Sequence, residues 1–224
     1  AGKGGVGAGS EAPVDDAKQA VTRKLARAGK AFRKLGYFSF WCQLVLSVVS
    51  SVILVFSVAV GGSSVQPTGS GPGLYLTLFG LIAAFLSTFW SFGYVRLGAN
   101  LQKLAQRPEE APSRAKVVSN LTSGVTINVL GMGAAIFGLE VEVGLLVAKT
   151  LTSASTNPFT AGMVANYNPV LALDVFLVQA STNAIMSHFV GLALSLWLLR
   201  SVATPGSRPG SAPAVGGKGG AAPA

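Results

Sequence analysis

The stretch YFSFWCQLVLSVVSSVILVFSVAV, residues 37–60, decides the fold class of this chain. It holds no charged residue over 24 positions, and about 20 apolar residues are enough for a helix to cross a bilayer core. Tyr37 and Trp41 stand at its start, where aromatic rings favour the headgroup level. Because a lipid-exposed backbone must satisfy its own hydrogen bonds, and the run shows no strand alternation, we expect a membrane-spanning helix.

Three further apolar runs follow, at residues 74–95, 117–139 and 169–199. Half of all residues are hydrophobic and only 11% are charged, whereas a soluble domain carries about 25% charged residues. The sequence therefore predicts an all-α integral membrane protein, with a bundle of four transmembrane helices occupying residues 36–202.

The third run is rich in small residues. Gly131 and Ala135 are four residues apart, as are Ala134 and Gly138, and small residues at this spacing let two membrane helices approach closely. We interpret them as packing surfaces rather than as ligand contacts. The stretch that follows, residues 140–151, either prolongs this helix or runs along the membrane surface.

A basic amphipathic pattern occupies residues 15–35, with apolar residues on one helical face. Such a helix beside a span typically lies in the membrane interface and touches anionic headgroups, and docking on a partner protein is the alternative. The tails, residues 1–14 and 203–224, are rich in Gly and Ala and are expected to be disordered. The basic residues of the amphipathic helix are Arg23, Lys24, Arg27, Lys30, Arg33 and Lys34.

The net charge of +9 is unevenly distributed along the chain. The N-terminal segment, the predicted loop 96–116 and the C-terminal segment from Arg200 onward together hold sixteen of the seventeen basic residues, and Lys149 is the exception. Basic residues that flank membrane helices stay on the side from which insertion occurs. We therefore expect both termini on the inner side, and the charge indicates orientation rather than nucleic-acid binding.

Polar residues in the fourth run fall at different depths. His188 lies twelve residues before Arg200, which is about 18 Å and close to the midplane. Asp174 is about 39 Å from Arg200 and so belongs to the outer interface. Glu140 and Glu142 end the third run at that same outer level, where the three carboxylates suggest an acidic mouth. Pairing of Glu142 with Lys149 is the alternative.

Unpaired polar groups are costly in hydrocarbon, so we expect the polar residues of the fourth run to face other helices. Gln179 and Asn183 share this run with His188, and Asn128 on the third run lies at the depth of His188 and is expected to contact His188 or Asn183. Together with Asp174 they are candidates for a transport path, and interhelical hydrogen bonding alone is the alternative. Asp174 and His188 are also the candidate metal ligands.

Motifs of soluble enzymes are missing from the sequence. It holds no Gly-rich phosphate loop, no cluster of metal ligands at protease spacing and no Ser or Cys set beside a plausible base. We therefore expect neither catalytic residues nor a resident cofactor. The single cysteine, Cys42, lies within the first apolar run and is interpreted as a small hydrophobe.

Several stretches resemble the chloroplast inner-envelope family called Tic twenty-one, or permease in chloroplasts, of plants, algae and cyanobacteria. They are FWSFGY (89–94), NVLGMG (128–133), GLLVAKTL (144–151), NPVLALDVFLVQAS (168–181), SHF (187–189) and LLRSV (198–202). Asp174 and His188 lie inside these stretches, whereas Glu140 and Glu142 lie outside them, which lowers the standing of the two glutamates as iron ligands.

This resemblance implies a four-helix protein of the inner envelope, imported with a transit peptide that is then removed. It implies a permease for iron uptake and homeostasis in the plastid, with iron as the transported ion. A subunit or assembly factor of the protein-import translocon is the alternative. The expected partners are the lipid bilayer and either further copies of the chain or translocon subunits, and both termini would face the stroma.

Overall fold

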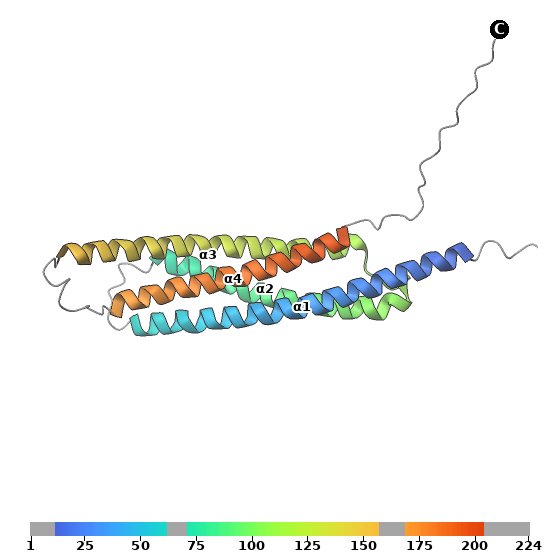
Figure 1. The fold of residues 1–224 in the computed structure, drawn as a ribbon, viewed down its shortest axis with the longest axis horizontal. Coiled ribbons are helices and arrows are strands. Elements are labelled where there is room, and N and C mark those ends of the chain that lie inside the picture. The colour runs from blue at the N-terminus through green and yellow to red at the C-terminus, as the bar shows by residue number, and fades with distance from the viewer. Residues whose placement is uncertain (1–11, 62–70, 157–168, 204–224) are drawn as a thin grey trace, which may run out of the picture.

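The computed structural model describes residues 12–61, 71–156 and 169–203, and their regular structure is entirely helical (Figure 1). The predicted all-α fold with four apolar spans is confirmed, because four helices are long and apolar enough to cross a membrane. They are α1 (Ala12–Gly61), α2 (Gly71–Lys103), α3 (Arg114–Thr156) and α4 (Pro169–Ala203), with two short 3-10 turns, η1 (Leu104–Gln106) and η2 (Pro108–Glu110), between α2 and α3.

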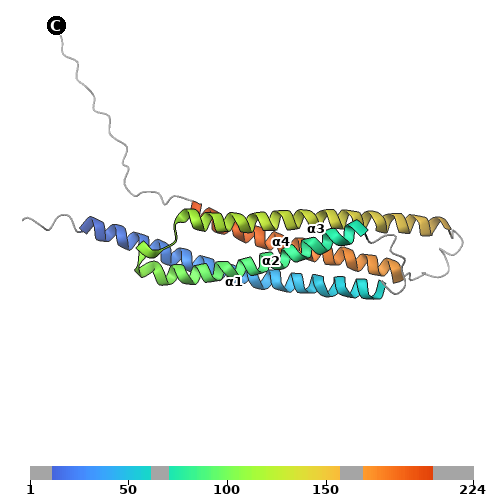
Figure 2. The ribbon, with the colours of Figure 1, turned by 180° about the vertical axis from the view of Figure 1, so that it is seen from behind.

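The four helices lie lengthwise beside one another as a bundle (Figures 1 and 2). Each packs against its neighbours in the chain, α1 also packs against α4, and α2 and α4 touch across the middle. This arrangement gives α2 and α4 contacts with all three other helices. Polar side chains on these two helices are therefore best placed to join groups from the whole bundle.

Polarity in the bundle is inverted relative to a soluble protein. The buried positions are mostly Ser, Thr, Ala, Gly and a few larger polar residues, while large apolar side chains cover the outside. Phe137 and Leu151, for example, are 66% and 67% exposed. Small buried residues allow close helix approach, and an apolar exterior is what a surrounding bilayer favours.

The basic segment 15–35 is continuous with the first span, since α1 runs through residue 36 without a break. Its six basic side chains are exposed, while Phe32 is buried and packs edge-to-face on Tyr94 of α2, with ring centroids 6.4 Å apart. Gly98 permits this crossing, because a Cβ there would lie 2.6 Å from the backbone nitrogen of Arg33. The segment thus extends the first span along α2, and its place at a membrane interface stays a prediction.

The predicted loop 96–116 is shorter than expected. Helix α2 continues to Lys103 because Leu101 is buried with Phe32, Val117 and Leu121 in an apolar cluster at this end of the bundle. At the other end, α3 continues to Thr156, so residues 140–151 prolong the third helix. The predicted disordered tails, residues 1–14 and 203–224, lie mostly outside the described part of the chain, but α1 begins at Ala12 and α4 ends at Ala203, so the prediction is wrong for residues 12–14 and 203.

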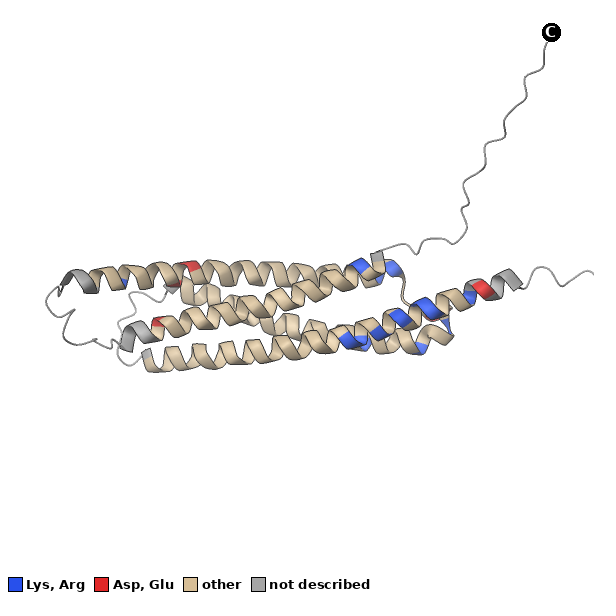
Figure 3. Cartoon of the chain, in the orientation of Figure 1, with Lys and Arg blue, Asp and Glu red and all other residues tan. Residues whose placement is uncertain are grey.

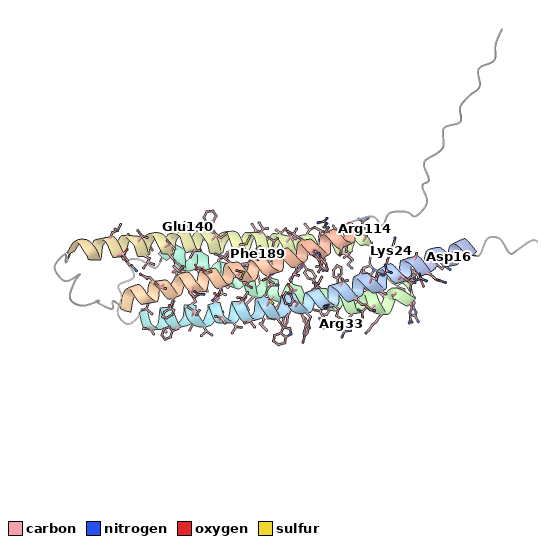
Figure 4. All side chains as sticks on the ribbon, viewed as in Figure 1. Asp16, Lys24, Arg33, Arg114, Glu140 and Phe189 are labelled. Atoms are coloured by element: carbon pink, nitrogen blue, oxygen red, sulfur yellow. The ribbon has the colours of Figure 1, made fainter. Side chains whose placement is uncertain are left out.

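Charge separates along the bundle (Figure 3). Lysine and arginine gather where α1 begins, α2 ends, α3 begins and α4 ends, whereas the acidic residues of α3 and α4 lie toward the opposite end. Figure 4 shows Lys24, Arg33 and Arg114 toward the basic end and Glu140 toward the other. This is the distribution expected of a protein oriented by its basic flanks.

Candidate functional site

One face of α2 carries a buried stripe of small and polar residues. The stripe covers about 26 Å along the helix, and its spacing of three and four residues keeps it turned toward the neighbouring helices. It is therefore the surface on which polar groups of the bundle gather. Its members are Thr77, Gly80, Ala84, Ser87, Ser91 and Tyr94.

Gln43 of α1 binds the middle of this stripe. Its Nε2 donates to Ser39 Oγ at 2.6 Å and to Ser91 Oγ at 2.8 Å. Its Oε1 accepts a hydrogen bond of 2.7 Å from Ser87 Oγ. All four side chains are buried, so the amide is fully paired inside the bundle.

Asn128 of α3 and His188 of α4 complete this central network. Oδ1 of Asn128 lies 2.8 Å from Ser87 Oγ and 3.1 Å from His188 Nδ1, while its Nδ2 donates to the Gly124 carbonyl at 2.9 Å. The second ring nitrogen, Nε2, lies 2.9 Å from the carbonyl oxygen of Gly80. The contact expected between Asn128 and His188 is present, and side chains from all four helices meet here.

A neutral His188 has fewer ring hydrogens than its two contacts require. Both ring nitrogens of His188 face acceptor oxygens, yet a neutral imidazole carries one N–H. The Nε2–H donates to the Gly80 carbonyl, which can only accept. The Nδ1 contact is satisfied by a second ring proton, or by a rotated Asn128 amide that presents Nδ2.

Gly131 makes room for the imidazole. A Cβ at this position would lie 2.5 Å from Nε2 of His188 and 2.7 Å from Cβ of Ala83. Ala135, one turn further, is fully buried. The small residues of the third run thus pack helices together, as the sequence predicts, and one of them also holds the histidine in place.

A second polar cluster lies toward the acidic end of the bundle. Glu142 of α3 is 7% exposed, and its two carboxyl oxygens lie 2.9 Å from Thr77 Oγ1 of α2 and 2.8 Å from Ser181 Oγ of α4. The two hydroxyl oxygens are themselves 2.9 Å apart. Three helices therefore meet at a single buried carboxyl group.

Lys149 and Asp174 lie beside this cluster. Nζ of Lys149 is 2.7 Å from Oδ2 of Asp174, and both residues line a small cavity with Glu142. The cavity holds about 20 Å³, which is room for about one water molecule. Lys149 thus pairs with Asp174, and the alternative pairing with Glu142 is not adopted.

The predicted acidic mouth is only partly assembled. Glu142 and Asp174 line one cavity, but Glu140 is exposed on the outside of α3. Gln179 is exposed as well, so the expectation that every polar residue of the fourth run faces another helix is wrong for it. Gln179 is exposed because it is adjacent to the buried Ala180, and one residue along a helix turns the side-chain direction by about 100°.

Asn183 is half-buried and accepts a 3.4 Å hydrogen bond from Nε2 of Gln179. The two residues therefore form a polar pair at the surface of α4, apart from the central network. Among the transport-path candidates, Asn128 and His188 are joined directly inside the bundle, whereas Gln179 and Asn183 are joined only to each other at its surface.

The two candidate metal ligands do not converge. Asp174 and His188 are fourteen residues apart on the same helix, about 21 Å along its axis, so one ion cannot touch both within a chain. Across the described residues, no group of three or more His, Cys, Asp or Glu side chains is close enough to hold a metal.

Sequence reasoning missed Gln43, Ser87 and Thr77, which lie within runs read as uniformly apolar. Their signal is the spacing of small and polar residues at three and four along the first two runs, which marks the inward face of a membrane helix. Such a stripe is recognised in the sequence only when serine and threonine are counted as helix-packing residues rather than as breaks in an apolar run.

Comparisons with known proteins identify relatives of this chain. Residues 22–203 match a family described as "Protein of unknown function (DUF3611)". The chain is 51% identical over 195 residues to "Protein TIC 21, chloroplastic" of Arabidopsis thaliana, an alignment that covers 87% of this chain and 64% of that protein. The chain thus spans just under two thirds of the length of this relative. No solved structure matches it.

Proposed function

Because this chain belongs to the DUF3611 family and is a homologue of Protein TIC 21, we propose that it is a multi-pass protein of the chloroplast inner envelope that works as an iron permease. The observation that carries this proposal is the buried polar core, in which His188, Asn128, Gln43 and Glu142 lie inside helices whose exterior is apolar. Polar and ionisable groups inside membrane helices are costly and typically mark ion pathways.

The chemistry of this core suits a hard or borderline cation. Carboxylate, amide and hydroxyl oxygens favour hard cations, and an imidazole nitrogen also suits iron. Asp174 would receive the ion at the acidic end, Asn128 and His188 would pass it through the middle, and the basic end would face the stroma. Side chains fill the bundle between these points, so passage requires the helices to exchange hydrogen-bond partners.

Four spans are few for a pathway, so the permease is proposed to work as a homo-oligomer. The surface pair of exposed Gln179 and half-buried Asn183 supports this, because polar groups on a lipid-facing surface gain from a second helix that supplies partners. Gln179→Leu is therefore expected to shift the purified protein toward the monomer in mild detergent. An unchanged mass distribution would argue against α4 as the contact.

Uptake of radiolabelled iron into proteoliposomes tests the permease directly. Asp174→Asn and His188→Ala are expected to reduce uptake sharply, because each removes a cation ligand or proton acceptor from the proposed path. Glu140→Gln is the matched control, since Glu140 is exposed outside the cavity and its loss should leave uptake unchanged. Unchanged uptake in both path variants, with the fold intact, would rule out the path.

A second function is favoured by the exposed face of α1. Its six basic side chains point outward beside the docked Phe32, and such a surface suits an acidic partner or an importing polypeptide. In this alternative the chain is a subunit or assembly factor of the import translocon. Photocrosslinks from Arg27 or Lys34 positions to a preprotein during active import would support it, and their absence would count against it.

A further inference from the structure

The cluster around Glu142 carries an inference that goes beyond the transport of iron. Three short oxygen–oxygen contacts join four oxygen atoms: Glu142 Oε1 to Thr77 Oγ1, Thr77 Oγ1 to Ser181 Oγ, and Ser181 Oγ to Glu142 Oε2. Each contact of 2.8–2.9 Å needs one hydrogen between its oxygens. Whether all three contacts can be hydrogen bonds therefore depends on whether the carboxyl group carries a proton.

An ionised Glu142 leaves the cluster one hydrogen short. Thr77 and Ser181 each supply one hydroxyl hydrogen, so only two of the three contacts can be hydrogen bonds. If both hydroxyls donate to the carboxylate, the contact between Thr77 Oγ1 and Ser181 Oγ joins two lone pairs. A protonated Glu142 supplies the third hydrogen and closes a ring in which every oxygen donates or accepts as its chemistry allows.

The charged residues around the cluster also favour a protonated Glu142. The first half of α2 holds no charged residue, and the nearby charged residues of α3 and α4 are Lys149 and Asp174, bound to each other. Glu140, on the same helix, is exposed. Within the described ranges Glu142 makes no ion pair, and a buried carboxylate without a cation is costly.

We propose that Glu142, Thr77 and Ser181 form a proton-binding site, in which the Glu142 carboxyl group gains and loses one proton inside the bundle. On release, the proton leaves the carboxyl oxygen for solvent through the small cavity that Glu142 shares with Lys149 and Asp174. The two hydroxyls then both donate to the carboxylate, and the direct contact between Thr77 and Ser181 is lost.

Loss of that contact has a structural consequence. Thr77 belongs to α2 and Ser181 to α4, the two helices that touch across the middle of the bundle. Release of the proton therefore loosens the α2–α4 contact near the acidic end, whereas binding tightens it. The site works as a proton-controlled clamp between these helices.

Infrared spectroscopy of the purified full chain in lipid vesicles tests the proposal. We expect the carbonyl band of a buried carboxylic acid at neutral pH, its loss in Glu142→Gln and its retention in Glu140→Gln. Raising the pH should remove the band reversibly. A spectrum without this band at neutral pH, for instance because a small cation neutralises Glu142, or a band that survives in Glu142→Gln, would overturn the site.

Glu142→Gln is expected to fold, because its amide can donate to one hydroxyl and accept from the other as the protonated acid does. If it does not fold, Thr77→Val and Ser181→Ala provide the test, since at least one of them removes the donor to the carbonyl oxygen and must shift the band. An unshifted band in both would overturn the ring. The proton site does not rest on the permease: failed iron uptake with the band intact would overturn only the permease.

Discussion

The ammonium group of Lys149 on α3 lies 2.7 Å from Oδ2 of Asp174 on α4, and this pair closes the acidic end of the bundle beside Glu142. It ties together the two helices whose connection, residues 157–168, lies outside the described chain. It also occupies the carboxylate that the permease would use to receive a cation. In the proposed permease, Lys149 would thus be both a structural partner of Asp174 and a competitor of the cation for it.

Replacement of Lys149 separates these two roles. Lys149→Gln should change the free energy of unfolding by less than about 1 kcal/mol, because the side chains of the pair are 35% and 18% exposed and water screens their attraction. The same variant frees Asp174, so iron uptake at low iron concentration should rise. Melting in detergent and vesicle uptake measure the two effects. A fall in uptake with unchanged melting would argue against Asp174 as the entry.

The fold was predictable because its signals are local. Runs without charge over more than 20 residues leave no alternative to helices, and the basic flanks predict their direction across the membrane. The helix ends were not predictable in the same way. Residues 96–103 look polar enough for a loop, yet Leu101 is drawn into the cluster around Phe32, a contact between helices that no single run reveals.

The candidate site was predictable only where polar residues interrupt an apolar run. His188 and Asn128 stood out for that reason, and depth alone placed them together. Gln43 did not, because its partners are serines on two different helices, and serine is too common in membrane helices to attract notice. Glu142 was placed correctly at the acidic end, but its burial depends on the rotation of α3 against Thr77 and Ser181.

Close packing against His188 yields a prediction about Gly131. Gly131→Ala places a methyl group 2.5 Å from Nε2 of the imidazole, so the ring or α3 must move, and overpacking of this kind costs about 1–3 kcal/mol. Gly133→Ala is the matched control, since nothing lies within 4 Å of its Cβ and alanine is the better helix former by about 1 kcal/mol.

Thermal unfolding in detergent should therefore rank Gly131→Ala below the unaltered protein and Gly133→Ala level with it or above. Adding His188→Ala to Gly131→Ala removes the ring that the methyl group strikes and should recover part of the loss. Equal melting of the two glycine variants would show that the imidazole does not occupy this position.

The crossing of α1 and α2 decides whether the basic segment is docked or free. Gly98→Val inserts a side chain where a Cβ already lies 2.6 Å from the Arg33 nitrogen, so it should push α1 off α2 and expose Phe32. Trypsin should then cleave faster at the basic residues of α1. Gly93→Val, at a position with open space around its Cβ, is the control. Equal cleavage in both would mean that the segment is not held by this contact.

Single introduced cysteines can test the orientation of the chain in the membrane. The chain has one natural cysteine, Cys42, so a single substitution removes the background. In a Cys42→Ser background, Glu109→Cys lies in η2 at the basic end, and Leu151→Cys lies on the exposed surface of α3 toward the acidic end. Basic flanks remain on the inner side of a membrane, so a membrane-impermeant maleimide added to intact inner-envelope vesicles of native orientation should label only the cysteine at position 151.

Detergent should then expose position 109 to the reagent as well, which controls for its reactivity. Labelling of position 109 alone would reverse the orientation and place the acidic cavity on the stromal side. The proposed route for the cation, from Asp174 toward the basic end, would then lead out of the plastid rather than into it.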